Sequence, residues 1–160
     1  MTGAATDMAD QVQLVCFRVG PQEFALDILQ VERILRHIAP APLPQAPPFL
    51  EGVVPYEGGV VPVVDLRKRF ELPAGLREET RLMIVDLDDQ RIGVLVDQVR
   101  EVLRVASTTI TAPGPMVSGL AAGYIAGIVT RPERTIIILN ARKLLTSTER
   151  LALAQLGGPA

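Results

Sequence analysis

Residues 24–36 read Phe24-Ala25-Leu26-Asp27-Ile28-Leu29-Gln30-Val31-Glu32-Arg33-Ile34-Leu35-Arg36, and the pattern returns 68 positions later as Ile92-Gly93-Val94-Leu95-Val96-Asp97-Gln98-Val99-Arg100-Glu101-Val102-Leu103-Arg104. Further blocks match in the same order. Residues 13–19 match 81–87 at the same shift, and after an insertion of about seven residues, 49–54 match 124–129 and 61–68 match 136–143. The sequence therefore predicts two copies of one strand-rich unit.

The repeat halves span about residues 11–78 and 79–147. Units of this size bury too little apolar surface to be stable alone. We therefore expect the copies to share a core within a single domain, residues 11–147, and the seam between them to be a natural place for a partner. Residues 1–10 are expected to form a flexible tail, and residues 148–160 a C-terminal helix and tail.

Alternating apolar residues and turn signals predict about ten short strands. They include residues 13–19 and the strand containing Phe24, and three hairpins, at 52–66, at 81–97 and at 124–139. Many short strands with few helices favour an all-β fold of paired small barrels.

Some segments of the chain break this strand pattern. Val31, Ile34, Leu35 and Ile38 are spaced as on one helix face, which predicts a short helix or turn there and again at residues 99–104. Pro62 interrupts its strand and indicates an edge or a bulge. Thr148 is expected to cap the final helix through about Leu156.

Residues 40–48 hold five of the chain's thirteen prolines and must be extended, because proline restricts its own backbone and that of its predecessor. One interpretation is a polyproline ligand for another protein's groove. A stiff crossover within the fold is the interpretation we favour.

Composition excludes several classes of function. The net charge is −2, without a basic stripe, so nothing indicates nucleic-acid binding. No apolar run reaches the ~18 residues that a membrane span needs, and residues 1–10 lack the basic start of a secretory signal. One cysteine allows no internal disulfide, and the chain fits the cytoplasm.

Candidate catalytic and metal-binding residues are isolated from one another. His37 is the only histidine, and Cys16 lies in an apolar, strand-like run. Asp86, Asp88 and Asp89 could hold a hard cation, but a solvated hairpin loop is the simpler interpretation. The phosphate-loop, serine-hydrolase and zinc-protease motifs are all missing from the sequence, so we expect a binding protein without cofactor or metal and not an enzyme.

Two aspartates, Asp65 and Asp97, each follow an apolar run. Each could pair with a neighbouring arginine, such as Arg67 or Arg100, or accept backbone N–H bonds. This arrangement predicts structural ion pairs and not an acid–base pair.

The order of these blocks resembles the CheW family of bacterial chemotaxis adaptors, over about residues 12–147. The specific runs are Gly58-x-Val60-Val61-Pro62-Val63-Val64-Asp65-Leu66-Arg67 and Gly93-Val94-Leu95-Val96-Asp97-x-Val99-x-Glu101-Val102. The resemblance implies two five-stranded barrels of the Src-homology-3 type around a shared core, with short helices. It also implies a non-catalytic scaffold that couples the cytoplasmic tips of methyl-accepting chemoreceptors to the regulatory domain of a histidine autokinase. Such a scaffold would lie in the cytoplasm, at membrane-associated receptor arrays, without inserting into the membrane.

The resemblance also carries site residues to this chain. Val31, Arg33 and Leu35 are expected to contact the kinase, and Tyr56, Glu57 and Gly58 to lie on the receptor side. The repeat equivalents of the kinase-contact set are Val99, Glu101 and Leu103, which offer a second protein-facing edge.

Two charges depart from the family pattern. Arg33 stands where the family usually has Glu, and Glu57 stands where it usually has Arg. Either the partners carry compensating charges, or Glu32 supplies the acid one residue away and Glu57 lies in a solvated hairpin tip. The two reversals motivate one rival function, a divergent CheW-like protein outside the array, which caps rings or competes with a standard adaptor. A rival of a different class is a barrel that binds a small molecule in the seam between the repeats.

Overall fold

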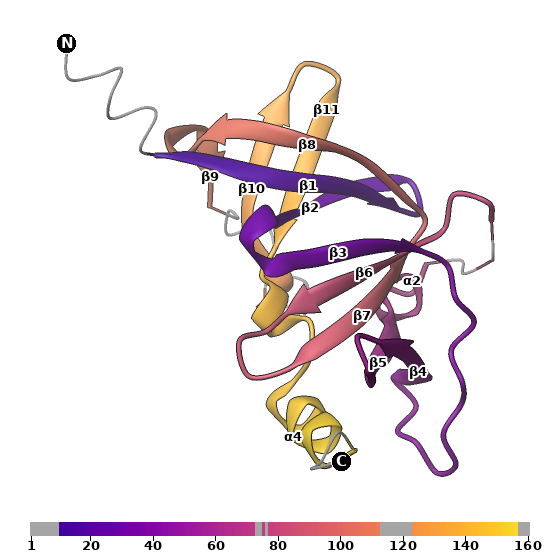
Figure 1. Ribbon diagram of the computed structural model, residues 1–160. Helices are drawn as coiled ribbons and strands as arrows, with labels where there is room; N and C mark the ends of the chain where they lie inside the picture. Colours follow the sequence, from indigo (N-terminus) through magenta and orange to yellow (C-terminus); the bar gives the residue numbers. More distant parts are fainter. Residues whose placement is uncertain (1–9, 73–74, 76, 113–122, 157–160) are drawn as a thin grey trace.

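The computed structural model describes residues 10–72, 75, 77–112 and 123–156, with no side-chain detail for 155 and 156. The expected flexible tail lies outside these residues apart from Asp10, as does the end of the C-terminal segment. Figure 1 shows two curved, twisted sheets, one above the other, with a helix at the C-terminal end.

The elements of the first half are β1 (Gln11–Val19), β2 (Gln22–Asp27), the 3-10 turn η1 (Ile28–Gln30), β3 (Val31–Arg36), β4 (Leu50–Tyr56), β5 (Gly59–Asp65) and α2 (Leu66–Arg69). Those of the second half are β6 (Arg81–Asp86), β7 (Arg91–Val96), β8 (Gln98–Ala106), η2 (Ser107–Thr109), β9 (Ile110–Thr111), β10 (Ile125–Arg131), β11 (Arg134–Leu139), η3 (Ala141–Lys143) and α4 (Ser147–Leu156). The three predicted hairpins are confirmed as β4–β5, β6–β7 and β10–β11.

Each sheet contains strands from both halves of the chain. The six-stranded sheet has the order β8-β1-β2-β11-β10-β9, and the five-stranded sheet has the order β3-β6-β7-β5-β4. The first two strands of each repeat are therefore exchanged, and the parallel pairs β2–β11 and β5–β7 join one half to the other. This exchange ties the halves into one unit, because neither sheet can form from one half alone.

The core has three parts, and its largest part lies between the sheets. This largest part is called the seam core here and contains Phe17, Met83 and Val85. On strand β6, Met83 and Val85 face the seam core, whereas Leu82 and Ile84 face a second cluster inside the five-stranded sheet. A third cluster, with Leu14 and Cys16, fills the six-stranded sheet. Strands buried on both faces read as continuous apolar runs, and the predicted shared core is confirmed.

The predicted helical turns at 31–38 and 99–104 are wrong, because residues 31–36 form β3 and residues 99–104 lie within β8. Each strand carries a β-bulge, at Glu32 and at Arg100, where two residues oppose one on the partner strand. Because of the extra residue, the half-buried Val31 and Leu35 are four positions apart, whereas their partners Val85 and Leu82 on β6 are three apart. A bulged strand thus shows the apolar spacing of a helix.

Pro62 lies in β5, which has neighbours on both sides, so it is not on an edge strand. Val53 lies opposite Pro62, but its backbone N–H and C=O form hydrogen bonds with Ala41 and not with β5. The pairing of β5 with β7 begins only at Val63. No strand therefore pairs with β5 at Pro62 on the β7 side, which makes this position locally an edge. The same Ala41 contacts hold the proline-rich segment against β4, which supports a crossover within the fold.

The cap of α4 is Thr146 and not Thr148. The Thr146 hydroxyl accepts from the Glu149 backbone N–H at 3.1 Å, and the Glu149 carboxylate accepts from the Thr146 N–H at 2.9 Å. This reciprocal capping box satisfies two donors at the helix start. Leu153 is buried and docks the helix, whereas Leu151 is exposed.

Candidate functional site

The first predicted edge lies on β3. Val31 and Leu35 are half-buried against the core and Arg33 is exposed, so only the arginine of this set points outward. Two outward-facing neighbours of Arg33 are not in this set: Glu32, which the sequence offered only as an alternative acid, and Ile34, which sequence reasoning missed. The alternation of a regular strand would have placed one of each adjacent pair inward, but the bulge turns Glu32, Arg33 and Ile34 outward together.

The second predicted edge lies on β8 and repeats this arrangement. Val99 and Leu103 are half-buried against the core, whereas Glu101 is exposed between the exposed Arg100 and Val102. Strands β3 and β8 each stand at one end of their sheet (Figure 1). The repeat symmetry therefore reaches the surface.

The predicted receptor-side residues form the tip of the β4–β5 hairpin. Glu57 and Gly58 have positive φ angles of 49° and 80°, as a tight two-residue turn requires. The Tyr56 hydroxyl donates to Glu32 at 2.7 Å, which raises the pKa of Tyr56. Arg91 lies 2.9 Å from Glu32 and 3.7 Å from Glu57, so the hairpin tip and β3 form one connected surface.

A second ion network supports β8. The Arg134 guanidinium donates to both oxygens of Glu23 at 2.8 and 2.5 Å and also reaches Glu101 at 2.5 Å. Arg100 lies 4.0 Å from Glu23. Hydrogen bonding to Arg134 lowers the pKa of Glu23, although burial opposes the shift, so this nearly buried carboxylate stays charged at neutral pH.

The predicted pairing of Asp65 and Asp97 with Arg67 is confirmed, whereas Arg100 instead lies near Glu23. Arg67 donates to both oxygens of Asp65 at 2.9 Å, to Asp97 at 3.2 Å and to the Gly75 carbonyl at 2.5 Å. The other oxygen of Asp97 accepts from the Gly20 N–H at 2.6 Å. This cluster connects β5, the β7–β8 junction and the β1–β2 turn, so it has a structural role.

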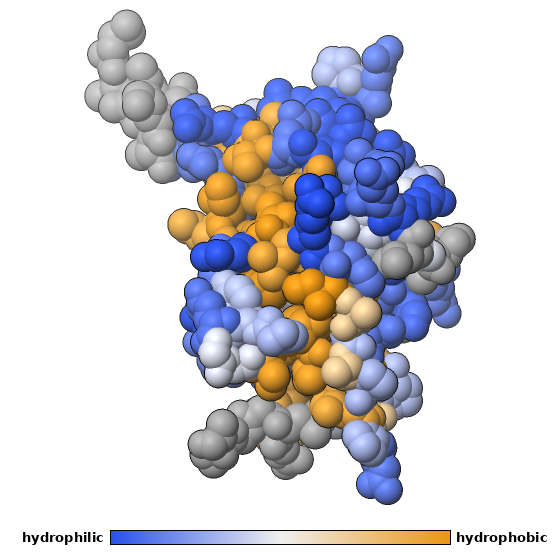
Figure 2. Space-filling model, turned by 45° about the vertical axis from the view of Figure 1, so that its right-hand side comes forward, coloured by the Kyte–Doolittle hydropathy of each residue, from blue (hydrophilic) through white to orange (hydrophobic). Residues whose placement is uncertain are grey.

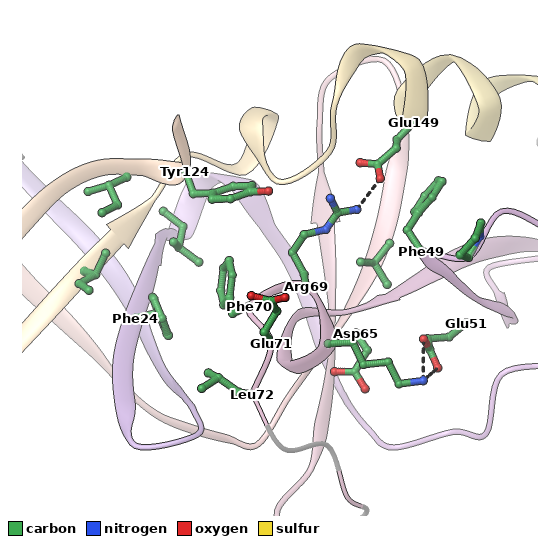
Figure 3. Close-up of a pocket in the computed structure, with 16 residues that line it drawn as sticks. Phe24, Phe49, Glu51, Asp65, Arg69, Phe70, Glu71, Leu72, Tyr124 and Glu149 are labelled. Atoms are coloured by element: carbon green, nitrogen blue, oxygen red, sulfur yellow. Dashed lines mark hydrogen bonds and ion pairs between the residues drawn. The ribbon is translucent and has the colours of Figure 1, made fainter. Parts of the chain in front are cut away.

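A groove of about 780 Å³ opens at the seam between the sheets (Figure 3). Four of the chain's six Phe and Tyr residues line it: Phe24, Phe49, Phe70 and Tyr124. The Arg69 guanidinium reaches across, 5.8 Å from the Phe49 ring centre and 2.8 Å from Glu149. The groove has the volume and apolar lining of a small-molecule site.

Three candidate chemical residues form no reactive site. Burial raises the pKa of the Cys16 thiol to about 11, so it is a poor nucleophile. Asp88 and Asp89, in the acidic hairpin, form ion pairs with Arg142 and Arg150. Within the described residues, no group of three or more His, Cys, Asp or Glu side chains could hold a metal ion.

The surface and the helices add two observations. In Figure 2 an apolar band runs down the middle of one face, bordered by hydrophilic surface on both sides. Contiguous apolar surface of this kind is typical of protein contacts. Among the described helices, none is long and apolar enough to cross a membrane.

These features define a class: a doubled small β-barrel whose exposed strand edges suit it to binding other proteins. The CheW-like domain family matches residues 13–149, and the chain belongs to this family. The predicted resemblance is therefore confirmed.

Individual relatives agree with this assignment. The chain is 30% identical over 152 residues to the chemotaxis protein CheW of Treponema pallidum, covering 92% of this chain and 89% of that protein. It is 30% identical over 154 residues to protein FrzA of Myxococcus xanthus, covering 94% and 96%. The crystal structure of the scaffolding protein TtCheW from Thermoanaerobacter tengcongensis superposes with a TM-score of 0.78 at 29% identity, covering 86% of this chain and 90% of that chain. The predicted pair of Src-homology-3-like barrels is confirmed, but one sheet has six strands and not five, because the two-residue strand β9 pairs with β10.

Proposed function

We propose that this protein is a non-catalytic adaptor that couples chemoreceptors to a histidine autokinase in a bacterial chemosensory array. The observation that carries the proposal is the pair of equivalent bulged edges on a chain that belongs to the CheW-like family. A scaffold must hold two partners at once, and two equivalent exposed edges on one chain support that role. Coupling then consists of one partner's state changing the free energy with which the other is bound.

The site residues take the following roles in this proposal. Val31, Arg33 and Leu35 contact the regulatory domain of the kinase, with Arg33 as the outward-facing charge. The Tyr56-Glu57-Gly58 tip faces the receptor's cytoplasmic end. The protein acts in the cytoplasm, at receptor arrays.

The charges at Arg33 and Glu57 determine which partners fit. A kinase for this adaptor carries an acidic residue opposite Arg33, and a receptor carries a basic residue opposite Glu57. Truncating or reversing one charge of a close pair costs about 2–5 kcal/mol, much of it as an unpaired charge. This chain therefore discriminates against the partners of adaptors that have the opposite charges.

Calorimetric titration against regulatory domains of histidine autokinases from the same organism tests the proposal. We expect micromolar or tighter binding to one domain and weaker binding by Arg33→Glu. Lys143→Glu, which makes the same charge change at an exposed position on η3, is the control. Unchanged affinity of the Arg33 variant, or no binding by any domain, contradicts the proposal.

The two charge reversals also favour one alternative, a divergent CheW-like protein outside the array that caps rings or competes with a standard adaptor. Such a protein binds kinase but does not restore receptor control in an adaptor-null strain. Full rescue of that strain contradicts this alternative.

The seam groove supports a second candidate function, the binding of a small molecule. A ligand that binds only the folded state raises the melting temperature by mass action. A thermal-shift screen against metabolites, repeated with Phe70→Ala, tests this function, and a flat screen removes its support.

A further inference from the structure

The seam groove is lined by aromatic rings that contact one another. The rings of Phe24 and Phe70 stack with their centres 5.2 Å apart, and the Phe70 ring meets the Tyr124 ring edge-on at 5.7 Å. Phe70 and Tyr124 are only half-buried, so part of each ring faces the groove. The face of an aromatic ring is partly negative and attracts cations as well as apolar groups. The groove therefore suits a ligand that is apolar, positively charged or both.

The charges in the groove leave one carboxylate without a cation. Most of the charged side chains that line it form ion pairs: Lys68 with Glu51, Arg69 with Glu149, and Asp65 with the neighbouring Arg67. The remaining one is Glu71, which is exposed on the segment after α2 and forms no ion pair within the described residues. The charge that a ligand meets in the groove is therefore negative.

One end of the groove already holds a cation. The Arg69 guanidinium lies 5.8 Å from the centre of the Phe49 ring and 2.8 Å from the Glu149 carboxylate, so an aromatic ring and a carboxylate bind it together. Figure 3 shows this arrangement beside α4 and the Phe70 ring farther from that helix. Because Glu71 directly follows Phe70 in the chain, the same two kinds of group occur there, and no cation of the described chain pairs with Glu71.

We propose that the seam groove binds a small organic cation, with an ammonium or guanidinium group beside Glu71 and an apolar group against Phe24 and Phe70. The groove volume of about 780 Å³ lies within the range of about 300–1,000 Å³ that is usual for small-molecule sites. The hydrogen bond between such a cation and the carboxylate is charge-assisted, and the ring faces add to the attraction. The inference rests on the second candidate function proposed above and names its ligand class.

Ligands of other charge fit this groove less well. An organic acid would meet the negative Glu71, and it could reach Arg69 only by displacing the Glu149 carboxylate. A bare metal ion needs several oxygen ligands, whereas the groove offers one carboxylate without an ion pair among the described residues. A neutral apolar molecule gains contact with the rings but leaves Glu71 without a partner. An organic cation uses both features of the groove.

Titration of the isotope-labelled, full-length chain, followed by NMR of its backbone amides, tests this inference. The probes are phenylpropylammonium, phenylpropanol and phenylpropanoate, which share a ring and a short chain but carry a positive charge, no charge and a negative charge. We expect the ammonium to shift the amide signals of Phe24, Phe70 and Glu71. It should bind at least about fivefold more tightly than the alcohol, because it adds cation–π attraction and an ion pair. The carboxylate probe should bind most weakly.

A matched pair of variants tests the carboxylate, and the spectra show whether each variant is folded. Glu71→Gln should lower the affinity of the ammonium to about that of the alcohol, whereas Glu78→Gln, at an exposed position outside the groove lining, should not. The inference is wrong, although small-molecule binding stands, if the alcohol or carboxylate binds as tightly as the ammonium or if Glu71→Gln changes nothing. If no probe shifts the groove signals, the inference is overturned and only the thermal-shift screen still tests the second candidate function. Neither outcome bears on kinase binding, which the calorimetry measures separately.

Discussion

Replacing Arg67 by methionine should destabilise the protein strongly. Arg67 is 4% exposed and makes four hydrogen bonds that link α2 to Asp65, Asp97 and Gly75. Methionine fills similar space but leaves two carboxylates without their cation. Removing one partner of a buried ion pair costs about 3–5 kcal/mol. Because the Asp97 side chain is 18% exposed and can regain water, we expect about 3–4 kcal/mol.

The repeat provides the matched control for this substitution. Arg142 is the equivalent of Arg67, 75 positions later, with Asn140 in place of Asp65. Its side chain is 58% exposed and pairs with an exposed aspartate on the β6–β7 hairpin, Asp88. Exposed pairs contribute about 0–1 kcal/mol, so Arg142→Met should change stability little.

Urea denaturation followed by far-ultraviolet circular dichroism measures both variants, since the chain has no tryptophan for fluorescence. For a domain of this size, a loss of about 3 kcal/mol lowers the melting temperature by roughly 6–12 °C. A loss below about 1 kcal/mol for Arg67→Met, or equal losses for the two variants, would refute the structural role assigned to this cluster.

Three further outcomes follow from the structure. Arg134→Met should lower the free energy of unfolding at neutral pH but not at acid pH. The hydrogen bond from Arg134 lowers the folded-state pKa of Glu23, so the charged Glu23 stabilises the fold above its unfolded pKa of about 4.3, and this stabilisation is lost as pH falls through the folded-state pKa. Acid titrations of stability measure the difference between the two proteins. Cys16 should react with iodoacetamide at pH 8 only as fast as the chain unfolds, because burial raises its pKa to about 11; rapid labelling of folded protein would contradict this. Gly52→Ala should cost about 2–3 kcal/mol in urea melts, because Gly52 has a φ of 145° and a Cβ there would lie 2.4 Å from the Ala41 carbonyl oxygen.

The sequence predicted the hairpins and the shared core because both follow from local patterns. The turn at Tyr56-Glu57-Gly58-Gly59 is encoded by its own residues, and apolar runs such as residues 81–85 are too continuous for strands with one face in water. The exchange of strands was not predictable in this way. Equal repeat shifts fit both the exchanged and the unexchanged pairing. The pairings between the halves distinguish them: the parallel pairs β2–β11 and β5–β7 and the antiparallel pairs β1–β8 and β3–β6.

The site residues were predictable as segments but not as surfaces. The bulge at Glu32 changes which side chains face outward, and single-sequence periodicity interpreted that change as a helix. The contacts of Arg91 with Glu32 and Glu57 join β7 to β3 and to the tip of the β4–β5 hairpin, so no local pattern could place them together.

In the function proposed above, the seam core lies between the surfaces of the two partners. Val31 on β3 and Val99 on β8 are repeat equivalents, and both pack against the same seam core. A partner at the first edge therefore contacts a strand whose inner side touches the packing that supports the second edge. Protein interiors are close-packed and resist small displacements, so the angle between two partners bound at these edges is set by the seam. The chain also passes from one sheet to the other just before each edge strand, from β2 to β3 and from β7 to β8, so each edge is tied covalently to the other sheet.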